Sequence, residues 1–180
     1  MRKSGILLPV SSLPSEYGIG AFSKEAYEFV DFLESAGQGF WQILPLGPTG
    51  YGDSPYQSFS TFAGNPYYIA LEELVEKGWL TKEECEECDF GGDNGYVDYE
   101  KIYLSRFRIL RKAYERSGIG KEEDFRRFQE ENRFWLEDYG LYMAVKNSFG
   151  ARSWTEWEED IRVRKPEAVE AYKEKYKEEI

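Results

Sequence analysis

The chain has 180 residues, of which 34 are acidic, 23 are basic and none is histidine, giving a formal net charge of −11. This length suits one domain, or one domain with an appended piece, and a negative charge of this size repels a phosphate backbone. We therefore expect no nucleic-acid partner. The absence of histidine excludes Ser-His-Asp and Cys-His nucleophile pairs and the common His-based metal sites.

No apolar run approaches the roughly 20 residues that span a bilayer, and the apolar run at residues 5–8 is too short for a secretory signal. We expect a cytoplasmic protein without membrane contact. Aromatic residues make up 17% of the chain. Flat rings with polar edges suit sugar ligands, but an aromatic-rich core would give the same composition, so composition leaves both interpretations open.

The two cysteines, Cys85 and Cys88, form a C-x-x-C motif among four glutamates. A redox function requires a depressed thiol pKa, which neighbouring carboxylates oppose, and a zinc site requires further Cys or His ligands that the sequence lacks. The motif favours two incidental thiols on an acidic surface helix, with a thiol-redox protein as the alternative.

The first 45 residues predict one β-α-β unit of a parallel sheet. Residues 5–8 form an apolar run typical of a buried strand, and residues 40–44 form a second one. Between them, apolar residues recur at helical spacing from Ser23, an N-cap candidate, to Gly37, which ends the helix.

The segment from Pro45 to Pro66 has neither helical nor strand periodicity and is rich in Gly, Pro, Ser, Thr and aromatic residues. Such a long irregular segment inside a compact domain is more often functional than idle. It follows the carboxyl end of the second predicted strand, which is the edge where α/β folds bind ligands. We therefore predict a ligand-binding loop.

Helices are predicted to dominate from Tyr67 onward. The expected segments are a short helix closed by Gly78, an acidic helix at 82–88, a longer helix from Asp98 to Gly118, two helices near 122–131 and 135–147, and one that starts at Pro166. Two buried strands cannot close a sheet, and a complete (β/α)₈ barrel takes roughly 250 residues. The chain is therefore expected to be part of something larger.

Residues 41–60, from Trp41 through Tyr56 to Ser60, resemble the second-strand loop of amylomaltases, the 4-α-glucanotransferases that disproportionate maltodextrins. Residues 5–20 resemble their first strand and loop, 97–103 their helical insertion, and 135–139 a later helix within it. The similarity covers essentially the whole chain. It implies an α/β fold: the N-terminal part of a (β/α)₈ TIM-type barrel with a mainly helical inserted subdomain.

The resemblance implies three segments: residues 1–66 with the first β/α units and the substrate loop, 67–165 as the inserted subdomain, and 166–180 as the start of a helix leading back to the barrel. It also implies a retaining double displacement on α-1,4-glucan without a cofactor or a metal. The catalytic carboxylates of the family lie beyond Ile180. No catalytic residue is expected here, and the chain by itself is expected to be inactive.

The resemblance assigns Tyr56 as a ring that stacks on the sugar at the cleavage point, with Asp53, Ser54 and Asn65 as polar contacts or loop braces. The alternative is that Tyr56 packs under the loop and Asp53 only caps a turn. Tyr51 and Tyr103 resemble the pair that forms a second glucan-binding groove, although Tyr103 also fits the core stripe of its own helix.

The expected partners are α-1,4-glucan oligosaccharides and the remaining C-terminal barrel of the same enzyme. A non-catalytic α-glucan-binding module is the alternative function.

Overall fold

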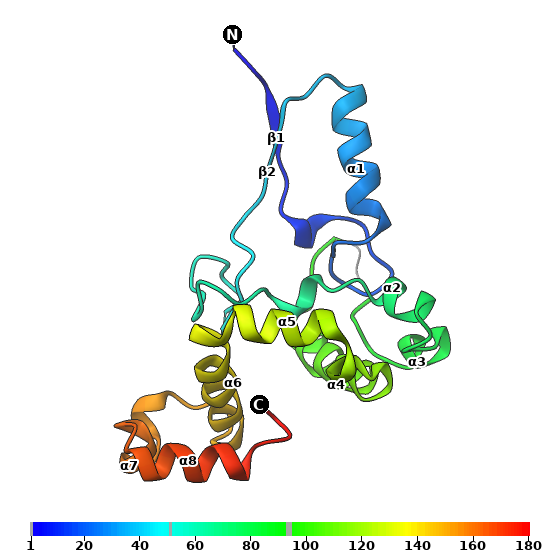
Figure 1. Ribbon diagram of the computed structural model, residues 1–180. Coiled ribbons are helices and arrows are strands. Elements are labelled where there is room, and N and C mark those ends of the chain that lie inside the picture. The colour runs from blue at the N-terminus through cyan, green and yellow to red at the C-terminus, as the bar shows by residue number, and fades with distance from the viewer. Residues whose placement is uncertain (1, 51, 93–94) are drawn as a thin grey trace. The chain divides into compact units, whose positions relative to one another are not determined.

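The computed structural model describes residues 2–50, 52–92 and 95–180 (Figure 1). The chain forms two compact units, Met1–Ile119 and Gly120–Ile180, which are described separately. The three segments expected from the sequence, 1–66, 67–165 and 166–180, concern a different division, between a barrel and its insertion. They stay a prediction.

The first unit begins with the expected β-α-β arrangement. Strand β1 (Gly5–Leu7) pairs in parallel with β2 (Phe40–Gln42), and helix α1 (Lys24–Ser35) connects them. Ser23 precedes α1 as its N-cap, and Gly37 ends the turn beyond it with a φ of 67°. The predicted parallel unit is confirmed.

One face of α1 packs against the strands. Ala26 and Leu33 are buried, and the Phe29 ring meets the edge of the Trp41 ring at 5.0 Å between centroids. The Trp41 indole nitrogen donates a hydrogen bond of 2.8 Å to the carbonyl of Leu8. This packing joins the helix to both strands.

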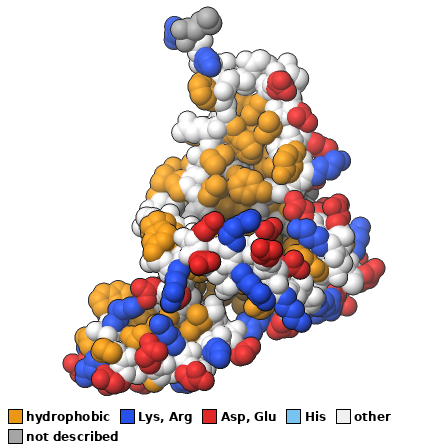
Figure 2. All heavy atoms as spheres, viewed as in Figure 1, with side chains coloured by type: hydrophobic (Ala, Val, Ile, Leu, Met, Phe, Trp, Pro, Cys, Tyr) orange, Lys and Arg blue, Asp and Glu red, His pale blue; other side chains and the backbone are white. Residues whose placement is uncertain are grey.

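The strands themselves are exposed, so the prediction that they are buried is wrong for this chain. Leu7 is 56% exposed and Phe40 is 60% exposed. A parallel strand becomes buried only when helices cover both faces and neighbouring strands flank it, whereas the sheet in the described residues has two strands. Figure 2 shows hydrophobic side chains gathered over the part of the molecule that carries β1, β2 and α1.

After the irregular segment that follows β2, the first unit is helical, as expected. It contains a 3₁₀ turn η2 (Pro66–Tyr68) and the helices α2 (Leu71–Glu76), α3 (Lys82–Glu86) and α4 (Tyr99–Ser117). Thr81 and Glu84 form a capping box at α3, the Asp98 side chain accepts from the Lys101 amide at the start of α4, and Gly118 ends α4 with a φ of 61°. These helices share a core with Tyr17 and Ile19, which belong to the loop between β1 and α1, here called the first loop.

That core contains an arginine. Arg106 on α4 is 1% exposed, its Nη2 donates to the Ile69 carbonyl, and burial lowers its pKa to about 10. Cys85 is also a core residue, at 0% exposure, which corrects the expectation that both cysteines lie on the surface.

The second unit, Gly120–Ile180, is helical. Its helices are α5 (Glu123–Glu131), α6 (Arg133–Ser148), α7 (Glu159–Arg162) and α8 (Pro166–Lys175), with 3₁₀ turns at Ile119–Lys121, across the boundary of the units, and at Trp154–Glu156. Its core consists of Leu141, Val145, Trp157 and Ile161. Across the described ranges, no helix has the length and apolarity needed to cross a bilayer.

Candidate substrate-binding loop

The irregular segment after β2 closes on itself. At its base the Asn65 amide donates a hydrogen bond of 2.8 Å to the Leu46 carbonyl. Further in, a Cβ added at Gly47 would lie 2.4 Å from the Ser58 hydroxyl oxygen, so the two arms of the segment touch at this point. A side chain at this position would require the Ser58 side chain to move. The segment is therefore a closed loop whose two ends are fixed to each other.

The Tyr56 side chain lies on the outside of this loop. It is 73% exposed, so it does not pack in the interior as the alternative interpretation required. Pro55 fixes the backbone immediately before it, and a turn closes there with a hydrogen bond of 3.1 Å from the Gln57 amide to the Ser54 carbonyl. The ring is thus available to a ligand. That it stacks on a sugar stays a prediction.

Asn65 lies under the loop. It is 7% exposed, and its side-chain oxygen accepts a hydrogen bond of 3.0 Å from the Tyr67 amide, which caps η2. Of the two functions expected for Asn65, this geometry favours the loop brace over the direct polar contact.

Asp53 occupies an unusual backbone conformation for a non-glycine residue, with a φ of 52°. Its carboxylate accepts a hydrogen bond of 3.4 Å from the Thr49 hydroxyl. Burial raises the pKa of the Asp53 carboxyl, and that hydrogen bond opposes the rise. Asp53 is thus a partly desolvated carboxylate held within the loop. Its role as a polar contact to a sugar stays a prediction.

Asp53 also lies near two tyrosines that are not among the site residues expected from the sequence. Burial raises the pKa of the Tyr67 and Tyr99 hydroxyls, and the negative charge of Asp53 raises both further. The two rings are 6.4 Å apart. Tyr67 follows the loop directly and Tyr99 begins α4, and no sequence spacing indicates that they meet beside Asp53.

The expected second groove is only partly described. Tyr51 lies outside the described residues. Tyr103 on α4 is 49% exposed, and its ring meets the edge of Phe107 at 5.2 Å, while Phe107 in turn meets Tyr67 at 6.0 Å. Tyr103 is thus at the edge of the aromatic cluster around Tyr67, with an open side.

A parallel β-α-β unit with a long, closed, aromatic loop at the carboxyl end of its second strand is the arrangement of α/β enzymes that bind substrates at that edge. Comparison with known proteins gives the family. Residues 8–180 match the family described as 4-alpha-glucanotransferase. The chain belongs to this family.

Individual relatives are in agreement with this family assignment. The chain is 52% identical over 171 residues to a 4-alpha-glucanotransferase of Clostridium butyricum, with 95% of the chain and 35% of the relative covered. It is 44% identical over 183 residues to the 4-alpha-glucanotransferase of Thermus thermophilus, covering 99% of the chain and 36% of the relative.

Among solved structures, the amylomaltase from Streptococcus agalactiae in complex with acarbose superposes with a TM-score of 0.91 at 41% identity. That superposition covers 99% of this chain and 37% of the amylomaltase chain. The chain therefore spans little more than a third of the length of these relatives. The resemblance found in the sequence is confirmed.

Proposed function

We propose that this chain supplies part of the glucan-binding cleft of a 4-α-glucanotransferase, which transfers α-1,4-glucan segments between maltodextrin or starch chains. The observation that carries the proposal is the exposed Tyr56 ring, 73% accessible, on a closed loop at the carboxyl end of β2 in a chain of this family. A ring presented in this way offers its face to a pyranose. The amylomaltase from Streptococcus agalactiae is in complex with acarbose, which supports a sugar as the occupant.

The proposed reaction is a retaining double displacement. One carboxylate attacks the anomeric carbon while a second protonates the departing oxygen, and a sugar hydroxyl in place of water then accepts the glycosyl group. We place both carboxylates beyond Ile180, in the remaining C-terminal barrel. In this chain, Tyr56 positions the sugar, Ser54 and Asp53 contribute polar contacts, and Asn65 holds the loop.

The same barrel accounts for the exposed strands. Ile6 and Leu7 of β1 and Phe40 of β2 are apolar yet open to solvent. We propose that further β/α units of a (β/α)₈ barrel cover them, that residues 67–165 form the inserted subdomain, and that the protein works in the cytoplasm. Family membership favours this transferase over a non-catalytic glucan-binding module, which is the remaining alternative.

Titration with maltooligosaccharides, followed by tryptophan emission, tests the binding proposal. Tyr56→Ala should weaken affinity roughly three- to tenfold, because it removes one aromatic stacking contact. Tyr27→Ala is the matched control, since Tyr27 is 68% exposed but lies on α1. Equal affinities of wild type and Tyr56→Ala would show that the Tyr56 ring does not stack on the sugar.

Incubation of the 180-residue chain with maltotriose tests where the catalytic residues lie. We expect neither glucose nor longer dextrins. Product formation by this chain would show that its own carboxylates perform the transfer.

A further inference from the structure

The two cysteines differ in environment. Cys85 on α3 is fully buried and lies in the core of the first unit, next to the Tyr17 hydroxyl. Cys88 is half-buried and lies just past the end of α3. One thiol is therefore accessible to a small reagent from solvent, and the other is not.

The backbone holds the two cysteines within bonding range. The Cys88 amide donates a hydrogen bond of 3.1 Å to the Cys85 carbonyl, so the two residues are the first and last of one tight turn. The ends of such a turn have Cα atoms less than about 7 Å apart, and disulfides span roughly 4.4–6.8 Å between Cα atoms. No large backbone movement is required to join them.

The two residues also line the same cavity. Its volume is about 210 Å³, and its other walls come from the loop between β1 and α1, from α3 and from the segment before α4: Glu16, Tyr17, Lys82, Glu86, Asp89, Phe90 and Gly91. The cavity gives a small reagent access to Cys88, with Cys85 in the wall of the same cavity.

Two of the four glutamates that flank the cysteines in the sequence are paired with basic side chains in the structure. Of the neighbouring glutamates, Glu84 is held by Lys112 and Arg116 at 2.6 Å each, and Glu86 pairs with Lys82 at 3.7 Å.

A positive charge contacts the Cys88 thiol directly, because Arg108 Nη2 donates a hydrogen bond of 3.5 Å to its Sγ. The guanidinium therefore lies where it can stabilise the negative charge that develops when the Cys88 sulfur attacks an oxidant. Burial raises the pKa of the Cys85 thiol to about 11, with smaller contributions from Cys88 and nearby glutamates. Cys88 is therefore the thiol that reacts first.

We propose that Cys88 and Cys85 form a reversible intramolecular disulfide, in which Cys88, assisted by Arg108, reacts first with a peroxide. The Cys88 thiolate attacks the peroxide, the O–O bond breaks, and the products are a sulfenic acid on Cys88 and hydroxide. The Cys85 sulfur then attacks the sulfenic sulfur, the S–S bond forms, the S–O bond breaks, and hydroxide leaves and takes up the proton of the Cys85 thiol as water. A small dithiol reverses the reaction. The site is separate from the proposed glucan transfer and does not depend on it.

Treatment of the protein with hydrogen peroxide, followed by iodoacetamide and intact-mass measurement, tests the proposal. We expect a species that has lost two hydrogens and takes up no alkyl group, and that regains both thiols with dithiothreitol. Cys88→Ser should resist oxidation, because its remaining thiol is buried. Wild-type protein that keeps two alkylatable thiols, or that forms only dimers linked through Cys88, would overturn the proposal.

Two arginine variants on α4 test the assisting charge. Arg108→Ala should slow the reaction of Cys88 with peroxide roughly threefold or more. Arg111→Ala removes the same charge from the same helix, but Arg111 pairs with Glu115 at 3.1 Å, so its rate should match wild type. Equal rates in wild type and Arg108→Ala, or equal slowing in both variants, would refute the role of Arg108.

Discussion

At the scale of single residues, two glycines share a backbone conformation but differ in their surroundings. Gly18 and Gly78 have φ values of 75° and 70°. A Cβ added at Gly18 would lie 2.1 Å from the Phe90 carbonyl oxygen, whereas one added at Gly78 meets no atom within 4 Å. The first position therefore combines backbone strain with a steric clash, and the second has the strain alone.

We expect Gly18→Ala to lower the free energy of unfolding by at least about 2 kcal/mol and Gly78→Ala by roughly 1 kcal/mol. Chemical denaturation of both variants measures the difference. Failure of Gly18→Ala to fold, while Gly78→Ala folds normally, would agree with the clash. Equal losses would show that the first loop moves away from Phe90 at little cost.

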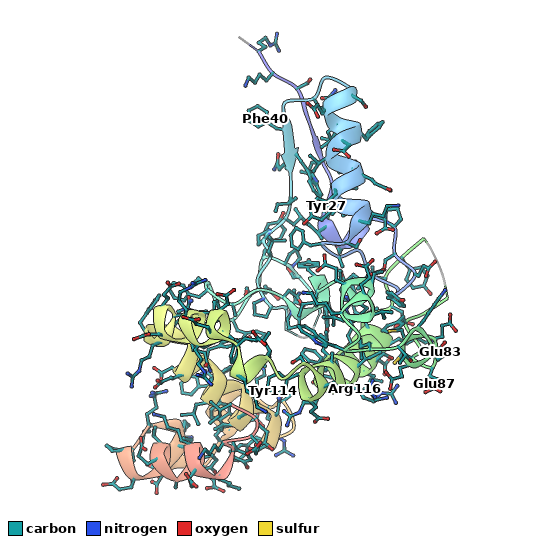
Figure 3. The ribbon with its side chains drawn as sticks, turned by 45° about the vertical axis from the view of Figure 1, so that its right-hand side comes forward. Tyr27, Phe40, Glu83, Glu87, Tyr114 and Arg116 are labelled. Carbon is teal, nitrogen blue, oxygen red and sulfur yellow. The ribbon has the colours of Figure 1, made fainter. Side chains whose placement is uncertain are left out.

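At the scale of elements, a single carboxylate joins α3 to α4. Glu84 accepts from Lys112 and, with both oxygens, from Arg116, while its side chain also completes the capping box with Thr81. A five-residue helix such as α3 is not stable by itself. Figure 3 labels Glu83 on α3, Glu87 just past its end, and Arg116 on α4.

The pKa of Glu84 is lowered to about 2, first by the hydrogen bonds from Arg116 and then by those from Lys112. A carboxylate whose folded-state pKa is depressed contributes stability above its ordinary pKa, and that contribution is lost as the pH falls through the folded-state value. For Glu84 this interval runs from 4.5 down to about 2.

We therefore expect Glu84→Gln to lower the thermal midpoint at pH 7, and the gap to wild type to narrow as the pH falls below 4.5. Added salt should also reduce the gap, because salt screens these partly exposed pairs. Glu87→Gln, on an exposed residue just past α3, serves as the control. A gap that stays constant with pH would mean that the charge of Glu84 is not what joins the helices.

At the scale of the whole molecule, the exposed apolar surface over β1, β2 and α1 sets the chain apart from a self-contained domain. Contiguous apolar surface of this kind marks an interaction site or an aggregation hazard. In Figure 3, Tyr27 on α1 and Phe40 on β2 are labelled in this region. We expect the 180-residue chain to bind hydrophobic dyes and to self-associate.

The double variant Leu7→Thr, Phe40→Thr should reduce dye binding and self-association, measured by sedimentation, while each substitution changes the unfolding free energy by only about 0.5 kcal/mol. Threonine preserves the strand preference. Leu33→Thr is the contrasting control, because Leu33 is 5% exposed and its loss should destabilise the fold by a few kcal/mol. Unchanged self-association in the double variant would show that another surface of the chain mediates it.

The parallel β-α-β unit, the order of the helices, the family and the loop that carries Tyr56 could all be predicted from the amino-acid sequence. Each of the structural features depends on local signals: apolar periodicity, the helix starts at Ser23 and Asp98, and the stop at Gly118 act within a few residues of chain. The assignment to the family depends on a long run of matching residues. Such a match can be found without knowing which residues are in contact.

Only the folded structure shows which side chains come into contact. Folding places Asp53 near Tyr67 and Tyr99, sets Arg108 against Cys88, and buries Arg106. It also buries Cys85, although its motif suggested a surface position. It also leaves both strands open to solvent. Such outcomes depend on contacts between residues far apart in the chain and on which faces find a covering partner, and neither is encoded in the spacing of nearby residues.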